Sequence, residues 1–285
     1  MKLALAQIDI TFEDKSKTKE TVMQFIEQAA TQNIDIILFP EMTLTGFSMN
    51  TSLIGEDNNE TIEFFKEKSS QFNITIGFGY VEGTSHSKNS YSVVSPLEIT
   101  RGVPREVIRG VPLEITRGVP QGVELVNYSK IHPFSFGSES EFYESGNEIK
   151  LFDAFGFTIA PFICYDLRFP EIFQIASKNA TLITVASNWP MKRREHWICL
   201  LKARAIENQC YIAGINRCGE ENGLIYSGDS MIIDPLGNII SSLYMEEGLV
   251  IADINQDDVI AIRERFRLKD DRKESLYYEL YLKNE

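Results

Sequence analysis

Three side chains of complementary chemistry each stand at the end of an apolar, strand-like run in this sequence. Glu41 follows the run at 34–39, Lys130 ends the run ELVNYSK, and Cys164 follows the run at 158–163. In α/β sheets, reacting groups collect at the carboxyl ends of the strands, so we expect these three to meet. A carboxylate, an ammonium and a thiol together suit acyl transfer through a thioester. Glu41 would take the thiol proton and later activate water, and Lys130 would stabilise the oxyanion.

The residues around Cys164 indicate a turn between a buried strand and a helix. Polar residues follow the cysteine at once, and Pro170 stands where a new helix can begin. The N-terminus of a helix offers N–H donors and positive potential, so we expect the pKa of Cys164 to be lowered. Each residue also has an ordinary interpretation: a buried structural cysteine, a carboxylate at a helix N-terminus and a solvated lysine. A Cys-His pair with His132 or His196 also stays open.

The composition limits the classes of partner and the cellular setting. The chain has 285 residues, 43% hydrophobic content and a formal net charge of −13, which disfavours binding to nucleic acid and to anionic membranes. There is no apolar run of membrane-spanning length and no signal peptide, so we expect a cytoplasmic protein with reduced thiols. The cysteines form no CxxC pair, and the histidines supply no zinc-ligand spacing. We interpret Cys199, Cys210 and Cys218 as structural, the first two on or beside the apolar face of a helix.

Apolar periodicity predicts alternating strands and helices along the chain. The expected helices are 17–32, 60–72, one that begins at Pro170, 193–209 and 257–266. The expected strands are 3–10, 34–39, 74–80, 90–95, 157–163, 182–186, 211–215, 230–233 and 249–254. Strands that are apolar on both faces indicate a sheet covered by helices, which is an α/β fold. No linker-like change in composition appears, so we predict a single domain over 1–285, with a C-terminal tail at 268–285.

Three tandem octapeptides interrupt this order. They read EITRGVPR, EVIRGVPL and EITRGVPQ and occupy 98–121. The period is too short for the common solenoids, and each copy has a Gly and a Pro that break regular structure. We therefore interpret 97–122 as an insert at a hairpin tip, where each doubling of loop length costs only about 0.6 kcal/mol of closure entropy. A binding arm is the functional alternative.

Longer sequence blocks surround the three reactive residues. They are FPEMTLTGF at Glu41, YSKIHPFSFGSESEFYESG at Lys130 and ICYDLRFPE at Cys164, followed by SNWPMKRREHW, LLKARAIENQCYIAGINRCG and YSGDSMIIDPLGN. Together they resemble the nitrilase superfamily, the carbon–nitrogen hydrolases, over nearly the whole chain. The resemblance implies an α-β-β-α sandwich in which Glu41 is the general base, Lys130 the catalytic lysine and Cys164 the nucleophile. It also implies that the reaction needs no metal and no organic cofactor.

The resemblance implies a second glutamate in the loop after the lysine. Glu139 matches that position best, and Glu141 and Glu144 lie close by as alternatives. A second carboxylate near Lys130 would keep its ammonium charged and oriented.

The blocks CYDLRFPE, SNWP and RARAIENQ are most similar to the ω-amidase branch. This similarity implies a small ω-monoamide substrate, such as 2-oxoglutaramate or 2-oxosuccinamate, with a carboxylate opposite the scissile amide. Arg168 would bind that carboxylate, and an internal salt bridge to Asp166 is the alternative. Aromatic residues would form the pocket wall; they are Trp189, Tyr165, Phe47 and Phe142.

Other interpretations remain for the substrate and for the activity itself. The substrate can instead be an N-carbamoyl amine, a deaminated-glutathione-like amide or a nitrile. A catalytically silent binding protein is the alternative of another class, although the intact Glu41, Lys130 and Cys164 argue against it. The family resemblance implies a homo-oligomer, and we expect a dimer. The C-terminal aromatic and leucine residues suit an interface; they are Leu276, Tyr277, Tyr278, Leu280, Tyr281 and Leu282.

Overall fold

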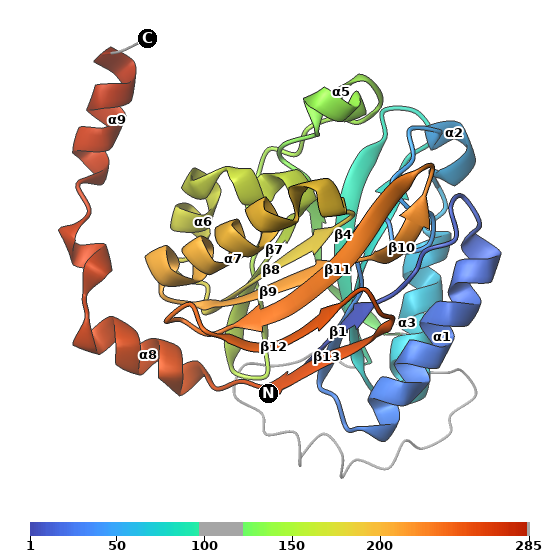
Figure 1. Cartoon of the computed structure of the whole chain (residues 1–285), viewed down its shortest axis with the longest axis horizontal. Helices are drawn as coiled ribbons and strands as arrows, with labels where there is room; N and C mark the ends of the chain where they lie inside the picture. The colour runs from blue at the N-terminus through green and yellow to red at the C-terminus, as the bar shows by residue number, and fades with distance from the viewer. Residues whose placement is uncertain (97–121, 284–285) are drawn as a thin grey trace.

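The computed structural model describes residues 1–96 and 122–283 of the chain. Two β-sheets lie face to face, and helices cover both outer faces (Figure 1). The helices are α1 (Lys15–Thr31) and α3 (Glu60–Phe72) on one face, and α6 (Pro170–Ala176) and α7 (Arg194–Asn208) on the other. This arrangement is the predicted α-β-β-α sandwich, and the α/β prediction is confirmed.

The first sheet has the order β13-β1-β2-β3-β4-β5. Strands β1, β2 and β3 are parallel, and the remaining neighbours pair antiparallel. Two antiparallel steps from β3 to β5 make β5 run in the direction of β2, so residues after β2 and after β5 reach the same edge. The strands are β1 (Lys2–Gln7), β2 (Ile36–Leu38), β3 (Thr75–Glu82), β4 (Lys88–Ser95), β5 (Val123–Ser129) and β13 (Gly248–Asp253).

The second sheet has the order β10-β11-β9-β8-β7-β6, and β12 pairs with β11. Its central strands β7, β8 and β9 are parallel, so their carboxyl ends also share one edge. The strands are β6 (Phe152–Ala154), β7 (Phe157–Ile163), β8 (Leu182–Ser187), β9 (Tyr211–Asn216), β10 (Cys218–Glu221), β11 (Leu224–Ile233) and β12 (Ile239–Tyr244).

Strand β1 explains how one sheet supports two apolar layers. Leu3 and Leu5 pack into the core between the sheets, whereas Ala4 and Ala6 pack on the other face with residues of α1 and α3. This follows from the period of two along a strand, which sends successive side chains to opposite faces. Both faces are buried, so the strand reads as a continuous apolar run in the sequence.

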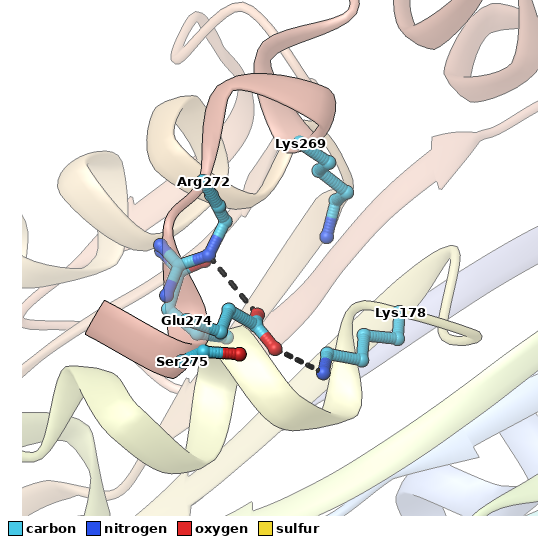
Figure 2. A pocket seen from close by; sticks show the side chains of 6 residues that line it. Lys178, Lys269, Arg272, Glu274 and Ser275 are labelled. Atoms are coloured by element: carbon cyan, nitrogen blue, oxygen red, sulfur yellow. Dashed lines mark hydrogen bonds and ion pairs between the residues drawn. The ribbon is translucent and has the colours of Figure 1, made fainter. Parts of the chain in front are cut away.

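The C-terminal segment extends from the body after β13 (Figure 1). It contains α8 (Gln256–Arg265), a short 3-10 helix η4 (Leu268–Asp271) and α9 (Glu274–Lys283). Figure 2 shows where it meets α6: Glu274 lies between Arg272 and Lys178, with Glu274 Oε2 2.6 Å from Lys178 Nζ. These residues and Lys269 line a pocket of about 390 Å³, here called the basic pocket. The apolar side chains of α9 that we expected at an interface are all exposed.

Most predicted elements are present, with bounds that differ by a few residues. The helix predicted at 60–72 is α3 (Glu60–Phe72), and the one predicted to begin at Pro170 is α6. Helix α9 and strands β6, β10 and β12 were not predicted. The octapeptides lie outside the described residues, but the strands on either side form the predicted hairpin, in which Ser95 pairs with Val123. Within the described residues, no helix is long and apolar enough to cross a membrane.

Candidate active site

Glu41, Lys130 and Glu139 form a buried charged cluster at the shared edge of the two sheets. Lys130 Nζ lies 2.9 Å from Glu41 Oε1, 2.8 Å from Glu139 Oε2 and 3.0 Å from Glu139 Oε1. The side chain of Lys130 is 1% exposed and the two carboxylates are 0% exposed. The three hydrogens of the ammonium therefore all have carboxylate acceptors. Glu41 follows β2, Lys130 follows β5, and Glu139 begins the short helix α5 (Glu139–Phe142).

Two asparagines that the sequence analysis missed hold the carboxylates in place. Asn89 Nδ2 on β4 donates to Glu41 Oε1 at 2.7 Å and to Glu139 Oε1 at 2.8 Å. Asn188, which follows β8, donates from its backbone N–H to Glu41 Oε2 at 2.9 Å, and from Nδ2 to the Glu41 carbonyl at 2.7 Å. Both oxygens of Glu41 thus accept hydrogen bonds, which fix the orientation of this carboxylate.

The charge of Lys130 depends on its two carboxylate partners. Burial by itself lowers the pKa of Lys130, because the charged form loses its hydration. Glu139 and then Glu41 outweigh that effect and raise the pKa of Lys130 well above its ordinary value. The ammonium therefore stays charged throughout the neutral and mildly alkaline range.

Cys164 stands at a strained turn between β7 and α6. It begins the 3-10 helix η2 (Cys164–Arg168) with φ of 44°, a left-handed conformation that is costly for a residue with a side chain. The buried carboxylate of Asp166 ties this turn down. Its Oδ2 accepts from the Tyr128 hydroxyl at 2.7 Å and from the Ile163 N–H at 3.1 Å, and its Oδ1 accepts from the His132 N–H at 3.0 Å. Asp166 has no ion pair with Arg168, so the alternative that we gave for Arg168 is wrong.

The expected lowering of the Cys164 pKa is also wrong. Burial raises the pKa of Cys164 strongly, Glu41 raises it further, and Lys130 only partly opposes them. Cys164 is followed by a short 3-10 helix and not directly by α6, which begins at Pro170, so the thiol does not stand at the N-terminus of that α-helix. Cys164 is thus a neutral thiol, which can act as a nucleophile only if a base removes its proton.

Cys164 and Lys130 lie at one pocket of about 240 Å³, here called the reactive pocket. Predicted residues in its lining are Phe47, Lys130, Cys164, Tyr165, Arg168 and Trp189. Arg168 lies over the Trp189 ring with 4.8 Å from Cζ to the ring centroid, and Lys130 Nζ lies 5.6 Å from the centroid of Phe47. The sequence did not single out the other lining residues, which are Phe134, Gly137, Asn188, Pro190, Arg193, Leu224 and Tyr226.

Several candidate residues lie elsewhere. Phe142 does not line the reactive pocket and is 44% exposed. Glu141 is exposed, and Glu144 lies 2.6 Å from His86 Nδ1. Of the three glutamates in the loop after Lys130, the structure therefore brings only Glu139 to that lysine.

The histidines and the remaining cysteines do not support a Cys-His pair. His132 stacks on Phe169, and His196 Nδ1 lies 3.2 Å from an Arg168 guanidinium nitrogen; neither histidine lines the pocket. Cys210 and Cys218 are buried as expected. Cys199 is exposed, so its predicted place at an apolar helix face is wrong.

Comparison with known proteins assigns the chain to a family. The Carbon-nitrogen hydrolase family matches residues 2–264. The chain belongs to that family, the nitrilase superfamily. The 2-oxoglutaramate amidase of Bacillus subtilis is 28% identical over 96% of this chain and 98% of that protein. The omega-amidase YafV of Yersinia enterocolitica is 31% identical over 93% of this chain and 94% of that protein. These relatives place the chain in the ω-amidase branch, as the sequence blocks predicted.

Solved structures share the fold. A CN-hydrolase superfamily protein from Xanthomonas campestris, with an arsenic adduct in its active site, has a TM-score of 0.80 and 26% identity over 96% of this chain and 97% of that one. An amidase from Nesterenkonia has a TM-score of 0.79 and 19% identity over 98% of this chain and 96% of that one. Together with the family match and the amidase relatives, this makes the chain a carbon–nitrogen hydrolase that acts on amides.

Proposed function

We propose that the protein hydrolyses a small ω-monoamide with a distal carboxylate, such as 2-oxoglutaramate or 2-oxosuccinamate, through a cysteine thioester. The observation that carries this proposal is the layout of the reactive pocket. It has Cys164 and Lys130 beside the buried Glu41, and a guanidinium, Arg168, held against the Trp189 ring. The names of the amidase relatives agree with this substrate class.

In the proposed reaction, Glu41 takes the thiol proton as Cys164 Sγ attacks the amide carbon. The carbonyl oxygen becomes an oxyanion, which Lys130 stabilises. Protonation cancels the charge of Glu41, so the Lys130 hydrogen that pointed to Glu41 is freed for the oxyanion. Glu41 then gives its proton to the leaving nitrogen, and ammonia and a thioester form. Glu41 next takes a proton from water as the water attacks the thioester. When the tetrahedral intermediate collapses, the C–S bond breaks, Glu41 returns this proton to Cys164 Sγ, and the acid product leaves and ionises in water.

Glu139 has a supporting part in this proposal. It accepts two hydrogen bonds from Lys130 and one from the Phe134 N–H at 2.6 Å, so it fixes the ammonium without facing the pocket. Asn89 joins Glu139 to Glu41 and keeps their separation constant.

Ammonia release from a panel of amides tests the substrate class. We expect turnover of ω-monoamides with a distal carboxylate and loss of turnover in Cys164→Ala, which keeps the fold. Arg168→Gln should lower kcat/KM for these substrates by roughly ten- to a hundredfold, because a charge-assisted hydrogen bond is lost. A neutral amide of the same length should be almost unaffected. Equal losses on both amides would make Arg168 a structural residue, and preference for a nitrile or an N-carbamoyl amine would overturn the substrate class.

We also propose that the chain forms a homodimer through its C-terminal segment. The support is the set of exposed aromatic and leucine side chains on α9, at 39–66% exposure, on a helix that extends from the body (Figure 1). Such side chains are enriched at interfaces. Light scattering at micromolar concentration should give twice the chain mass of 32.4 kDa, and a monomer there would contradict the proposal.

A further inference from the structure

The reactive pocket gathers positive charge without any acidic side chain in its lining. Its lining includes Lys130, Arg168 and Arg193, and among the described residues neither an aspartate nor a glutamate lines it. Glu41 and Glu139 lie behind Lys130, are 0% exposed and are already bonded to it. These two carboxylates balance the charge of Lys130, whereas Arg168 and Arg193 have no acidic side chain beside them in the lining. The two guanidiniums therefore mark the pocket as a site for an anionic group.

Arg193 resembles Arg168 in that its guanidinium also packs against an aromatic ring of the reactive pocket. Arg193 Cζ lies 5.3 Å from the centroid of Phe134, and Arg168 Cζ lies 4.8 Å from the centroid of Trp189. Both rings also line the pocket, so each guanidinium is held against one aromatic wall. The two cations are close enough to affect each other, since the pKa of Arg168 is lowered first by burial and then by the charge of Arg193.

Two guanidiniums that line one pocket of about 240 Å³ are stabilised by a ligand that supplies acceptors to both. A 2-oxo carboxylate does so, because its carboxylate and its adjacent carbonyl oxygen are all acceptors in one plane. A 2-amino carboxylate instead places an ammonium beside two cations, with no acidic residue in the lining to pair with it. Specificity here would come from repulsion as much as from attraction.

Building on the proposed function, we propose that Arg193 is a specificity-determining residue that acts with Arg168 to select 2-oxo acid ω-amides and to reject free α-amino acid amides such as glutamine. Its backbone is already part of the wall, because the Arg193 carbonyl accepts from Trp189 Nε1 at 2.8 Å. A substitution of the side chain leaves that hydrogen bond in place, so the effect of the guanidinium can be tested alone.

The test measures kcat and KM for 2-oxoglutaramate, glutaramate and glutamine in wild type, Arg193→Gln and Lys192→Gln. Lys192 is the matched control, because it is exposed, carries the same charge, precedes Arg193 in the same turn and does not line the pocket. Wild type should prefer 2-oxoglutaramate to glutamine by about a hundredfold or more in kcat/KM. In Arg193→Gln, the ratio of kcat/KM for 2-oxoglutaramate to that for glutamine should fall by about tenfold or more, mainly because KM changes. In Lys192→Gln, this ratio should stay within about twofold of the wild-type value.

A further variant separates charge from geometry. Arg193→Lys keeps a cation and should still reject glutamine, but it should bind 2-oxoglutaramate less well because an ammonium lacks the planar fork. An unchanged preference in Arg193→Gln would overturn the role of Arg193, with the proposed function intact. Wild type that releases ammonia from neither glutaramate nor 2-oxoglutaramate would overturn the proposed function, and this inference with it.

Discussion

Lys130 is buried and Lys269 is half-buried, and their environments shift the lysine pKa in opposite directions. Lys130 at the reactive pocket has two carboxylates within 3.0 Å, and its pKa is raised well above the ordinary value. Lys269 at the basic pocket donates to the Ser177 carbonyl at 2.8 Å and to the Ser177 hydroxyl at 2.6 Å, where α6 ends. Burial and then the charge of Arg263 lower the pKa of Lys269 to about 8.

The difference shows that the partner, more than burial, decides the charge of a lysine. Burial disfavours the ammonium at both places. Only full carboxylate charges overcome it, whereas the dipoles of a carbonyl and a hydroxyl do not. The reactive pocket thus keeps a permanently charged lysine, and the basic pocket holds one that changes its charge between neutral and alkaline pH.

Replacement of each lysine by methionine should give the largest difference in stability between the two sites. Lys130→Met leaves Glu41 and Glu139 buried without a countercharge, so we expect the free energy of unfolding to fall by about 3–5 kcal/mol and activity to be lost. Lys269→Met is the matched control and should have a much smaller effect on stability at pH 7 and no effect on kcat. Urea unfolding of both variants checks this, and equal destabilisation would show that the carboxylates do not set the difference.

Loss of one carboxylate partner should lower the pKa of Lys130, toward the situation of Lys269. In Glu139→Gln, the largest contribution that raises the Lys130 pKa is gone, so that pKa should fall. As pH rises, the ammonium would then lose its proton earlier than in wild type, and kcat should decline on the alkaline side of the profile. Glu141→Gln, an exposed neighbour on α5, is the control and should keep the wild-type profile. If Glu139→Gln has the same pH profile as wild type, Glu139 does not keep Lys130 charged.

Lys269 should make stability depend on pH in a defined window. Between pH 8 and 10.5, the unfolded chain still holds the proton that folded Lys269 has released. The unfolded state therefore binds more protons, and the free energy of unfolding rises with pH across this window. Urea unfolding at several pH values should show this rise in wild type relative to Lys269→Met. A constant difference between the two proteins from pH 7 to 10 would refute the shifted pKa.

The ion pairs on the rim of the basic pocket should matter least. Glu274 is solvent-accessible and contacts Lys178 and Arg272, a setting in which water and salt screen the attraction (Figure 2). We expect Glu274→Gln to leave the urea midpoint within the error of measurement, at both low and high salt. A clear, salt-dependent loss of stability would mean that this contact holds the C-terminal segment in place.

The residues that were predicted to meet, and that the structure brings together, are those with a local signal in the sequence. Glu41 and Cys164 each follow a strand that the apolar pattern defines, and Lys130 ends a third, so their meeting follows from sheet topology. Asn89 carries no such signal, since its importance comes from the pairing of β4 with β5, in which the Lys130 N–H donates to the Asn89 carbonyl at 2.9 Å. The Cys164 pKa was missed because its burial and the nearby Glu41 are set by tertiary packing.

Helix α9 and part of the pocket lining were also missed, because they carry no local signal in the sequence. Helix α9 was missed because its leucines and tyrosines fall around the helix without a clear polar face. Arg193 was overlooked because a basic run, KRRE, reads as a solvated surface. The sequence could not decide among the glutamates at 139, 141 and 144, because the fold of this loop determines which of them points toward Lys130.

The hairpin of β4 and β5 has a consequence for the gene as well as for the protein. Ser95 pairs with Val123 at one end, and Lys130 follows the other end, about 20 Å away at the usual rise of a strand. The octapeptides between Ser95 and Val123 are encoded by repeat units of whole codons, so the gain or loss of a unit keeps the reading frame. Because the closing pair fixes the strand register, we expect such copy-number changes to leave Lys130 in place. Strains that differ in the number of repeats would then encode enzymes of different length and equal activity, and an epitope tag could be exchanged for one unit.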